Sequence, residues 1–187
     1  KELAIKYIKQ VDFAKEMMAN PVPVTISNMG EVFTTRLEEY APRITADGKL
    51  LIFTSRRSDT KGGEIDKKGD YKFFEDIYFS RYDESTGEWT DSESLYGSVN
   101  TETYDAVLSV APDGSGIYVY KNTVTTTGDI YYSKHNQNDD TWLAATKMPK
   151  PINTSYFESS ISQTADGNTL YFISERPEGY GQGDIYV

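Results

Sequence analysis

The chain repeats itself with a period of 53 residues. Five features recur at this offset, each given by the positions of its two copies: Asp-Gly at 113 and 166, "EDIYFS" at 75 and "GDIYYS" at 128, "VNTE" at 99 and "INTS" at 152, Trp at 89 and 142, and an acidic residue at 105 and 158. Agreement of separate features at one offset indicates an internal repeat. Periods of 20–50 residues, close to this one, are typical of solenoids and propellers.

A third copy lies upstream and contains an insertion. Glu39 and the Asp47-Gly48 pair lie 66 positions before their counterparts, whereas "DIY" at 76–78 lies 53 positions before "DIY" at 129–131. The 13 extra residues fall within the polar stretch "RRSDTKGGEIDKKGDYKFFE" (56–75). The third unit is two residues longer at the same place, in "ERPEGYGQG" (175–183). Insertions at one point of a repeat mark one face of the assembly, often its binding face.

The middle unit predicts four short antiparallel strands. They are the runs "DAVLSV", "GIYVYK", "GDIYYSKH" and "TWLAAT", separated by turn sequences. In the second run we expect Ile117 and Val119 on one face and Tyr118 and Tyr120 on the other. A four-stranded unit of about this length is typical of a β-propeller blade. We therefore predict an all-β fold with about three four-stranded repeats of ~53 residues in an incomplete ring.

The chain divides into three parts. We predict a helix over 1–20, which either caps the propeller or ends a preceding helical-repeat domain. Residues 21–38 form a linker and the strand that leads into the first unit, and 39–187 form the partial propeller, with units at 39–103, 104–156 and 157–187. Because the third unit reaches "GDIYV" without its fourth strand, we expect further blades beyond Val187.

Composition excludes several classes of function. The net charge of −10 disfavours nucleic acids and anionic membrane surfaces as partners. The absence of cysteine excludes disulfides, thiolate catalysis and cysteine-ligated zinc. No apolar run reaches the ~18 residues of a membrane span, and the first residues do not have the pattern of a signal peptide.

The repeats resemble a known family. "ITADGKLLIFTSRR" with "EDIYFS", "VAPDGSGIYVYK" with "GDIYYS", and "QTADGNTLYFISERPEGYGQGDIYV" are similar to the TolB-type, WD-repeat-like β-propeller of OmpA-family envelope proteins of Bacteroidota. The resemblance covers about residues 30 to 187. It implies a periplasmic, outer-membrane-associated protein in the PorE-like layout of a type IX secretion accessory component. In that layout peptidoglycan is bound through a domain absent from this chain. The middle unit departs from the pattern, since "YVYKNT" replaces "FTSRR" and "FISER".

Residues that recur in every unit are interpreted as structural. Asp and Gly suit a tight turn, because Gly tolerates positive φ and Asp bonds nearby backbone groups. A strand Trp more often fills the space between blades than stacks on a sugar. The structural repeat positions are Asp47, Gly48, Asp76, Trp89, Asp113, Gly114, Asp129, Trp142, Asp166, Gly167 and Asp184.

Residues that break the repeat are the candidates for partner binding. Tyr and Arg are favoured at protein interfaces, and several stand in or beside the unequal loops. The candidate partner-binding residues are Arg56, Arg57, Tyr120, Arg176 and Tyr180. For the arginines, salt bridges between blades are the alternative role.

No chemical site is predicted. The insert carboxylates Asp59, Glu64, Asp66 and Asp70 do not have EF-hand spacing and alternate with lysines, so we expect no metal ion and no cofactor. The lone His135 is expected in an exposed turn. A glycosidase would need two positioned carboxylates, and the sequence pairs none. The sequence thus favours a non-enzymatic scaffold that binds envelope or secretion-system proteins. A carbohydrate-binding or glycan-processing propeller is the alternative.

Overall fold

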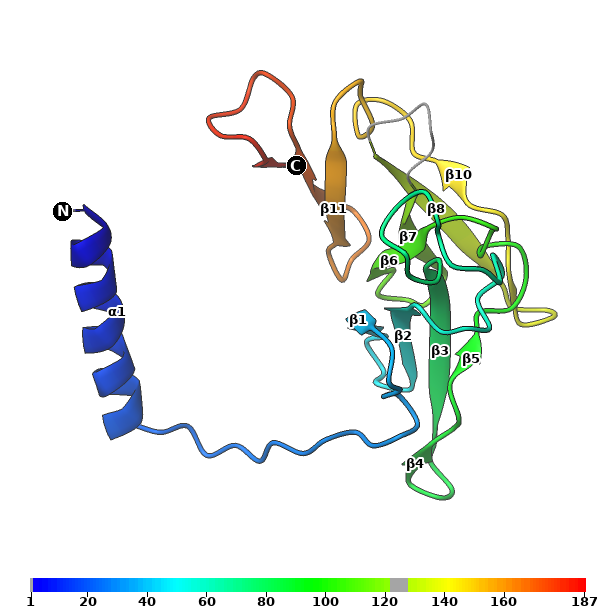
Figure 1. Ribbon diagram of the computed structural model, residues 1–187, viewed down its shortest axis with the longest axis horizontal. Coiled ribbons are helices and arrows are strands. Elements are labelled where there is room, and N and C mark those ends of the chain that lie inside the picture. The colour runs from blue at the N-terminus through cyan, green and yellow to red at the C-terminus, as the bar shows by residue number, and fades with distance from the viewer. Residues whose placement is uncertain (1, 122–127) are drawn as a thin grey trace.

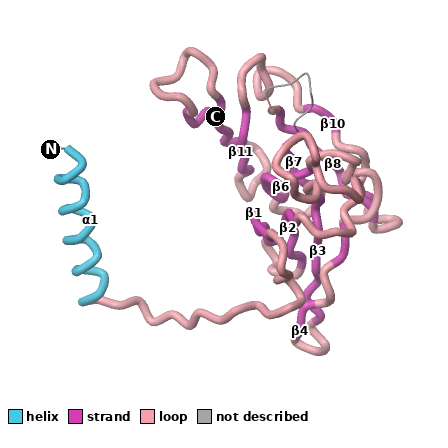
Figure 2. The backbone as a smooth tube through the Cα atoms, viewed as in Figure 1, coloured by secondary structure: helices cyan, strands magenta, loops and turns pink. Residues whose placement is uncertain are grey.

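The protein is mostly β, with one helix at its N-terminal end (Figures 1 and 2). The computed structural model describes residues 2–121 and 128–187. Helix α1 (Glu2–Ala19) buries no residue and lies beyond an extended segment, away from the sheets. It therefore does not cap the sheets, which is one of the two roles expected for it. Within the described residues, no helix has the length and apolarity to cross a membrane.

Each sequence unit forms its own antiparallel sheet, which confirms the fold class at this level. The first sheet contains β1 (Glu39–Ile44), β2 (Leu50–Ser55), β3 (Asp76–Asp83), β4 (Glu88–Trp89) and β5 (Glu93–Ser94). The second contains β6 (Asp105–Val110), β7 (Gly116–Lys121), β8 (Asp129–Asn136), β9 (Thr141–Trp142) and β10 (Thr146–Lys147). The third contains β11 (Glu158–Gln163), β12 (Leu170–Ser174) and β13 (Asp184–Tyr186), in that order.

The predicted fourth strand of the middle unit is interrupted. "TWLAAT" forms two short strands: β9 pairs with the end of β8 through Trp142 and His135, and β10 pairs further back through Thr146 and Tyr132. The first sheet shows the same division into β4 and β5, both paired with β3. The prediction of one continuous strand was wrong, because the segment between the two short strands leaves the ladder while its ends remain paired.

Successive sheets bury apolar side chains between them. One core cluster joins the first sheet to the second through Ile52 and Ile77 on one side and Ile117 and Val119 on the other. A second cluster joins the second sheet to the third and contains Tyr118 from β7, with Ile130, Ile161 and Phe172. The alternation predicted for β7 is therefore confirmed. Because β7 contributes to both clusters, the second sheet is covered on both faces.

The first strands of the three sheets are neighbours, with β6 between β1 and β11. The Asp-Gly turns gather at one end of the sheets. Gly114 lies beside Thr45 of the first turn, and a recess of about 270 Å³ is lined by the second and third turns. We call this the turn end. The opposite end is the loop end, and it carries the insert (56–75), the loop 175–183 and the segments 35–38, 101–104 and 154–157 that lead into the sheets.

An asparagine side chain closes the connection between units. The side chain of Asn153 accepts a hydrogen bond from the N–H of Ile130 (2.8 Å) and donates to the carbonyls of Ile130 (2.7 Å) and Met148 (2.8 Å). Asn100 makes the equivalent pair with the N–H and carbonyl of Ile77, at 2.9 and 3.0 Å. Both amides are buried. Each therefore continues the hydrogen bonding of β3 or β8 beyond the short strand β5 or β10 that pairs with it, and this explains the repeated "NT".

We expect Asn153→Ala to lower the free energy of unfolding by about 2 kcal/mol, because it leaves buried backbone groups of Ile130 and Met148 without partners. Chemical denaturation of the full-length protein measures this. Asn138→Ala is the matched control, since Asn138 is exposed in a hairpin turn and its side chain makes no hydrogen bond with any residue that the structure describes. Equal losses in the two variants would contradict this role for Asn153.

Candidate interaction face

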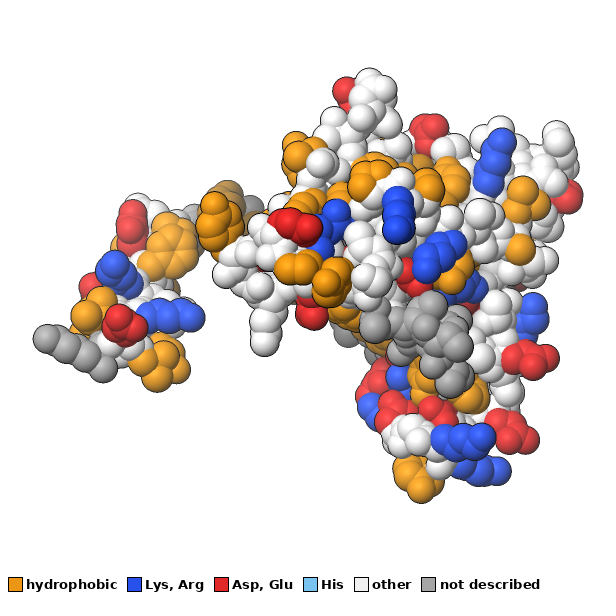
Figure 3. Space-filling view, turned by 90° about the horizontal axis from the view of Figure 1, so that it is seen from above, with side chains coloured by type: hydrophobic (Ala, Val, Ile, Leu, Met, Phe, Trp, Pro, Cys, Tyr) orange, Lys and Arg blue, Asp and Glu red, His pale blue; other side chains and the backbone are white. Residues whose placement is uncertain are grey.

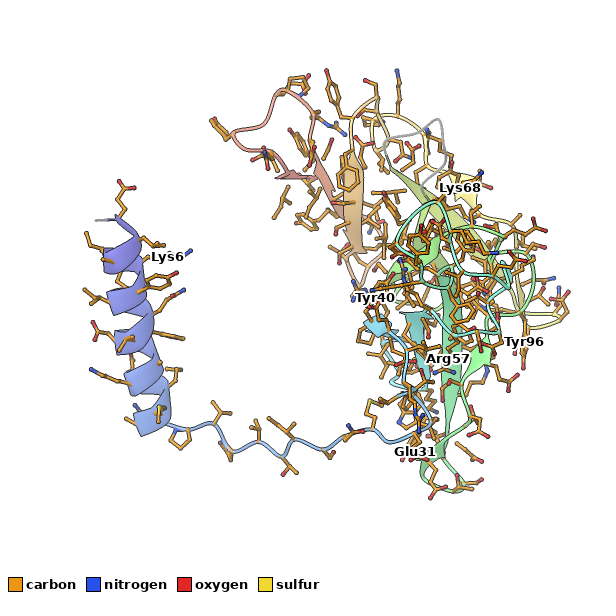
Figure 4. The ribbon with its side chains drawn as sticks, in the orientation of Figure 1. Lys6, Glu31, Tyr40, Arg57, Lys68 and Tyr96 are labelled. Atoms are coloured by element: carbon orange, nitrogen blue, oxygen red, sulfur yellow. The ribbon has the colours of Figure 1, made fainter. Side chains whose placement is uncertain are left out.

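The loop end presents the parts of the units that differ from one another. The insert 56–75 lies there above the first two sheets, with Lys68 labelled on it in Figure 4. Figure 3 looks onto this end and shows basic side chains beside apolar ones over the sheets. The strands, the Asp-Gly turns and the apolar cores are similar in all three units, whereas these loops differ. The loop end is therefore the surface on which one unit differs from another.

An acid, fully buried in the second and third units and partly buried in the first, fixes the start of each sheet at this end. Its carboxylate accepts hydrogen bonds from the backbone N–H and the hydroxyl of the Thr four residues earlier. The three pairs are Thr35 with Glu39 (3.2 and 2.6 Å), Thr101 with Asp105 (2.6 and 2.7 Å), and Thr154 with Glu158 (3.1 and 2.5 Å). The positions repeat at 66 and 53 residues, so the signal was present in the sequence. The role of the Thr was missed because a Thr–acid spacing of four has no fixed meaning without the fold.

Arg57 and Arg176 neutralise two of these acids. Arg57 lies 3.5 Å from Glu39, donates to the carbonyl of Phe33 (3.1 Å) and stacks over Tyr78. Arg176 lies 3.8 Å from Glu158, donates to the carbonyls at 151 and 152 and stacks over Tyr186. Their side chains are only 13% and 14% exposed. The structure thus places these two of the three predicted partner-binding arginines inside their units, where they contact an acid, backbone carbonyls and an aromatic ring.

In the middle unit a lysine pairs with the buried acid instead of an arginine. Lys121, from "YVYKNT", forms an ion pair with buried Asp105 and donates to the carbonyl of Val99 (3.0 Å). The position that matches Arg57 and Arg176 is 123, which lies outside the described residues. The departure of this unit from the Ser-Arg pattern therefore keeps a cation next to the acid.

Arg56 clamps the insert to the sheets. Its guanidinium pairs with Asp70 (2.6 Å) inside the insert and with Glu75 (2.6 Å) at its end, and it lies over the ring of Tyr104 from the second unit. Tyr104 in turn donates to Asp66, and burial with this bond raises the pKa of Tyr104 to about 12. With its side chain 12% exposed, Arg56 ties both the middle and the end of the insert to the sheets.

Tyr180 and Tyr120 lie in different surroundings. Tyr180 is fully exposed at the tip of the loop 175–183, where glycines flank it. Tyr120 is half-buried, its ring packs edge-on against Phe157 at 6.1 Å, and burial raises its pKa. Of the five candidate partner-binding residues, Tyr180 therefore has the most accessible side chain.

The aspartates of the "DIY" strands occupy equivalent positions with different partners. Asp129 pairs with Lys147 (2.8 Å), and Asp184 accepts from the N–H of Gly181 (2.9 Å). Asp76 is fully buried, and its Oδ2 accepts from the N–H of Lys61 (2.6 Å). Its Oδ1 has no hydrogen-bond partner among the described residues. Burial raises the pKa of Asp76 to about 6, and the nearby Asp105 adds to the shift.

The Asp-Gly pairs lie in the turns between the first two strands of each sheet. Gly48, Gly114 and Gly167 have φ of 73°, 70° and 74°, a conformation that disfavours side chains. Asp47, Asp113 and Asp166 each accept a backbone N–H from two residues further on, at 3.0 to 3.1 Å. Hydrogen bonds from the hydroxyls of Thr45, Ser115 and Thr164, followed by these backbone bonds, lower the pKa of the three carboxyl groups. The turn end is thus built from local backbone geometry.

The two tryptophans lie in unequal sites. Trp142 is 2% exposed in the cluster between the first two sheets, and its backbone N–H donates to the carbonyl of Tyr96 (2.9 Å). Trp89 is partly buried beside Phe33 on the other face of the first sheet. His135 stacks on Trp142 at 4.6 Å and bonds Asp140 (2.9 Å), with its side chain 14% exposed. The prediction that His135 lies in an exposed turn was wrong, because β8 extends to Asn136 and so includes His135.

The insert carboxylates are dispersed. Asp59 accepts a hydrogen bond from the hydroxyl of Tyr78, and Asp66 accepts one from the hydroxyl of Tyr104. Asp70 accepts one from the guanidinium of Arg56. Among the residues that the structure describes, no three acidic or histidine side chains come together in a group that could hold a metal ion. Asp59, Asp66 and Asp70 each fasten the insert at one point, whereas Glu64 only approaches Lys67 within the insert (3.9 Å).

A recess recurs beside the leading segments of the first and third units. In the first unit it measures about 260 Å³ and lies between Leu37 and the insert. In the third it measures about 330 Å³ and is lined by Tyr156, Arg176 and Tyr186, among others. Leu37 and Tyr156 occupy matching repeat positions. Among the residues that the structure describes, the loop end therefore has these two recesses, and the first is bordered by the insert.

No protein-family model matches the chain, and no curated protein matches it. Among solved structures, it is similar to the periplasmic gluconolactonase PpgL of Pseudomonas aeruginosa, with a TM-score of 0.44 and 15% identity over 71% of this chain and 35% of that chain. It is also similar to TolB from Acinetobacter baumannii, with a TM-score of 0.47 and 17% identity over 78% of this chain and 28% of that chain. The chain thus spans about a third or less of either protein.

Proposed function

We propose that the chain is part of a β-propeller that serves as a non-enzymatic protein-interaction module and binds its partner with the loop end. The observation that carries the proposal is that the unequal insertions of the repeat emerge at one end of the sheets. The sheets beneath them are joined by two apolar cores, so the loops stand on a rigid support. Rigid display of loops lowers the entropy lost on binding.

The setting of this module is proposed from sequence. The resemblance of residues 30 to 187 to TolB-type propellers supports a periplasmic protein associated with the outer membrane, in an OmpA-family, PorE-like layout. The partners in this proposal are envelope or secretion-system proteins. Carbohydrate processing remains the alternative outcome of the test, and its sign would be turnover of a glycan.

Photo-cross-linking from both ends of the sheets tests the proposal. A photoreactive phenylalanine analogue replaces Lys68 or Tyr180 at the loop end, and Thr86 or Asn138 in hairpins at the turn end, in the full-length protein in its native host. All four positions are exposed. We expect one discrete cross-linked protein from both loop-end positions and none from the other two. Cross-linking from the turn end alone, or hydrolysis of envelope glycan by the purified protein, would refute the proposal.

A further inference from the structure

The recess of the first unit has a lining unlike the rest of the acidic chain. Its apolar walls are Leu37 and Ile65, about 40% exposed each, together with Phe73 and Tyr71. Its charged lining consists of Arg36, Arg56, Lys72 and Glu38. Three cations and one anion therefore surround an apolar recess in a chain with a net charge of −10.

Arg36 is the cation in this lining that is free to bind a ligand. Arg56 is committed to Asp70 and Glu75, and Lys72 is committed to Glu38. Arg36 is exposed, and within the described residues its guanidinium forms no hydrogen bond or ion pair. An unpaired arginine beside apolar walls is suited to a carboxylate that follows a large apolar group.

Tyr71 gives the recess a preformed wall. Its backbone has φ of 60°, which is uncommon for a bulky residue, and its side chain is 73% exposed. It lies in a hydrogen-bonded turn, in which the N–H of Tyr71 donates to the carbonyl of Asp66 (3.1 Å) and the N–H of Asp66 to the carbonyl of Lys72 (2.8 Å). On either side of it, Asp70 pairs with Arg56 and Lys72 pairs with Glu38. A strained residue held in the open by its neighbours is an indication of function.

We propose that this recess binds a peptide segment of the partner in which a large apolar side chain is followed by an acidic residue. The apolar side chain would lie between Ile65, Leu37 and Tyr71, and the carboxylate would pair with Arg36. A volume of about 260 Å³ is below the usual range of pockets for whole small-molecule ligands, about 300–1,000 Å³, and suits a single side chain. The inference rests on the proposed function and specifies the chemistry that its binding face recognises.

The test uses short capped peptides and fluorine NMR on the full-length protein. The probe is acetyl-Gly-(4-fluoro-Phe)-Asp-Gly-amide, and a comparison peptide has Asn in place of Asp. One buried ring with one partly exposed ion pair corresponds to a dissociation constant on the order of 1 mM. We expect saturable broadening with the Asp probe and binding about fivefold weaker with the Asn probe.

Two variants locate the site. Arg36→Gln should bring the affinity for the Asp probe down to that for the Asn probe and leave the latter unchanged. Lys134→Gln, which removes an exposed cation near the turn end, should change neither. Equal affinities for the two probes, or no effect of Arg36→Gln, would overturn the proposal.

Peptide binding in the recess and protein binding at the loop end can fail independently of each other. If loop-end cross-links form in equal amounts with and without Arg36→Gln, the module stands and the recess does not contact the partner. If the Asp probe binds as expected and no loop-end position cross-links to a protein, the recess stands as a site for acidic ligands and the protein-interaction module is refuted.

Discussion

Replacing Asp76 by Asn is expected to stabilise the protein at neutral pH. The difference in unfolding free energy between Asp76→Asn and wild type should be up to about 3 kcal/mol more favourable to the variant at neutral pH than at pH 4. The wild-type carboxyl is fully buried, one of its oxygens has no partner among the described residues, and its pKa is raised to about 6 from 3.8. A shift of about two units corresponds to about 3 kcal/mol. An amide keeps an oxygen for the N–H of Lys61 and carries no charge.

The sign follows from proton linkage. A raised pKa means that the folded state holds its proton more tightly than the unfolded state. The charge of Asp76 therefore opposes folding increasingly as the pH rises from about 4 to about 6, and fully above that. The difference in unfolding free energy between Asp76→Asn and wild type should grow across this window and then level off. Urea denaturation at several pH values measures it.

Asp129→Asn is the matched control, because Asp129 starts the equivalent strand of the second sheet but pairs with Lys147. This variant loses an ion pair and should gain no stability at neutral pH. A destabilising effect of Asp76→Asn at pH 7.5, or a difference from wild type that is constant with pH, would contradict the account of Asp76 as a buried, incompletely bonded carboxylate.

The second large effect is expected from Trp142→Ala, which should lower the free energy of unfolding by about 3–5 kcal/mol. Trp142 fills the core between the first two sheets, and His135 stacks on its ring. Its loss opens a cavity where the two units meet. Trp89→Ala, at the matching repeat position, should cost clearly less, because Trp89 is only partly buried beside Phe33. Equal losses would mean that the two units are not packed as described.

The repeat made much of the fold predictable. Three copies of one turn, the alternation of Ile117 with Tyr118, and the strand "DIY" were all readable, because strands and turns depend on neighbouring residues. The interruption after Trp142 and the burial of His135 were not, because both depend on how far β8 extends against the next sheet.

The candidate site was less predictable than the fold. Arg57 and Arg176 are chemically suited to an interface, and only the structure shows that they face Glu39 and Glu158. The acids and the arginines each repeat in the sequence, but their pairing crosses from one strand to another. Arg36 was missed because it lies in the segment that leads into the first unit, where nothing in the sequence indicates the recess formed with the insert.

The measurement that tests the central claim most directly is hydrogen–deuterium exchange of the full-length protein with and without the partner that it captures. If the loop end is the binding face, the partner will slow exchange in the insert 56–75 and the loop 175–183. The turns at 45–49, 112–115 and 164–168 will exchange as before. Protection of the turns with unchanged exchange in the insert and the loop would contradict the account.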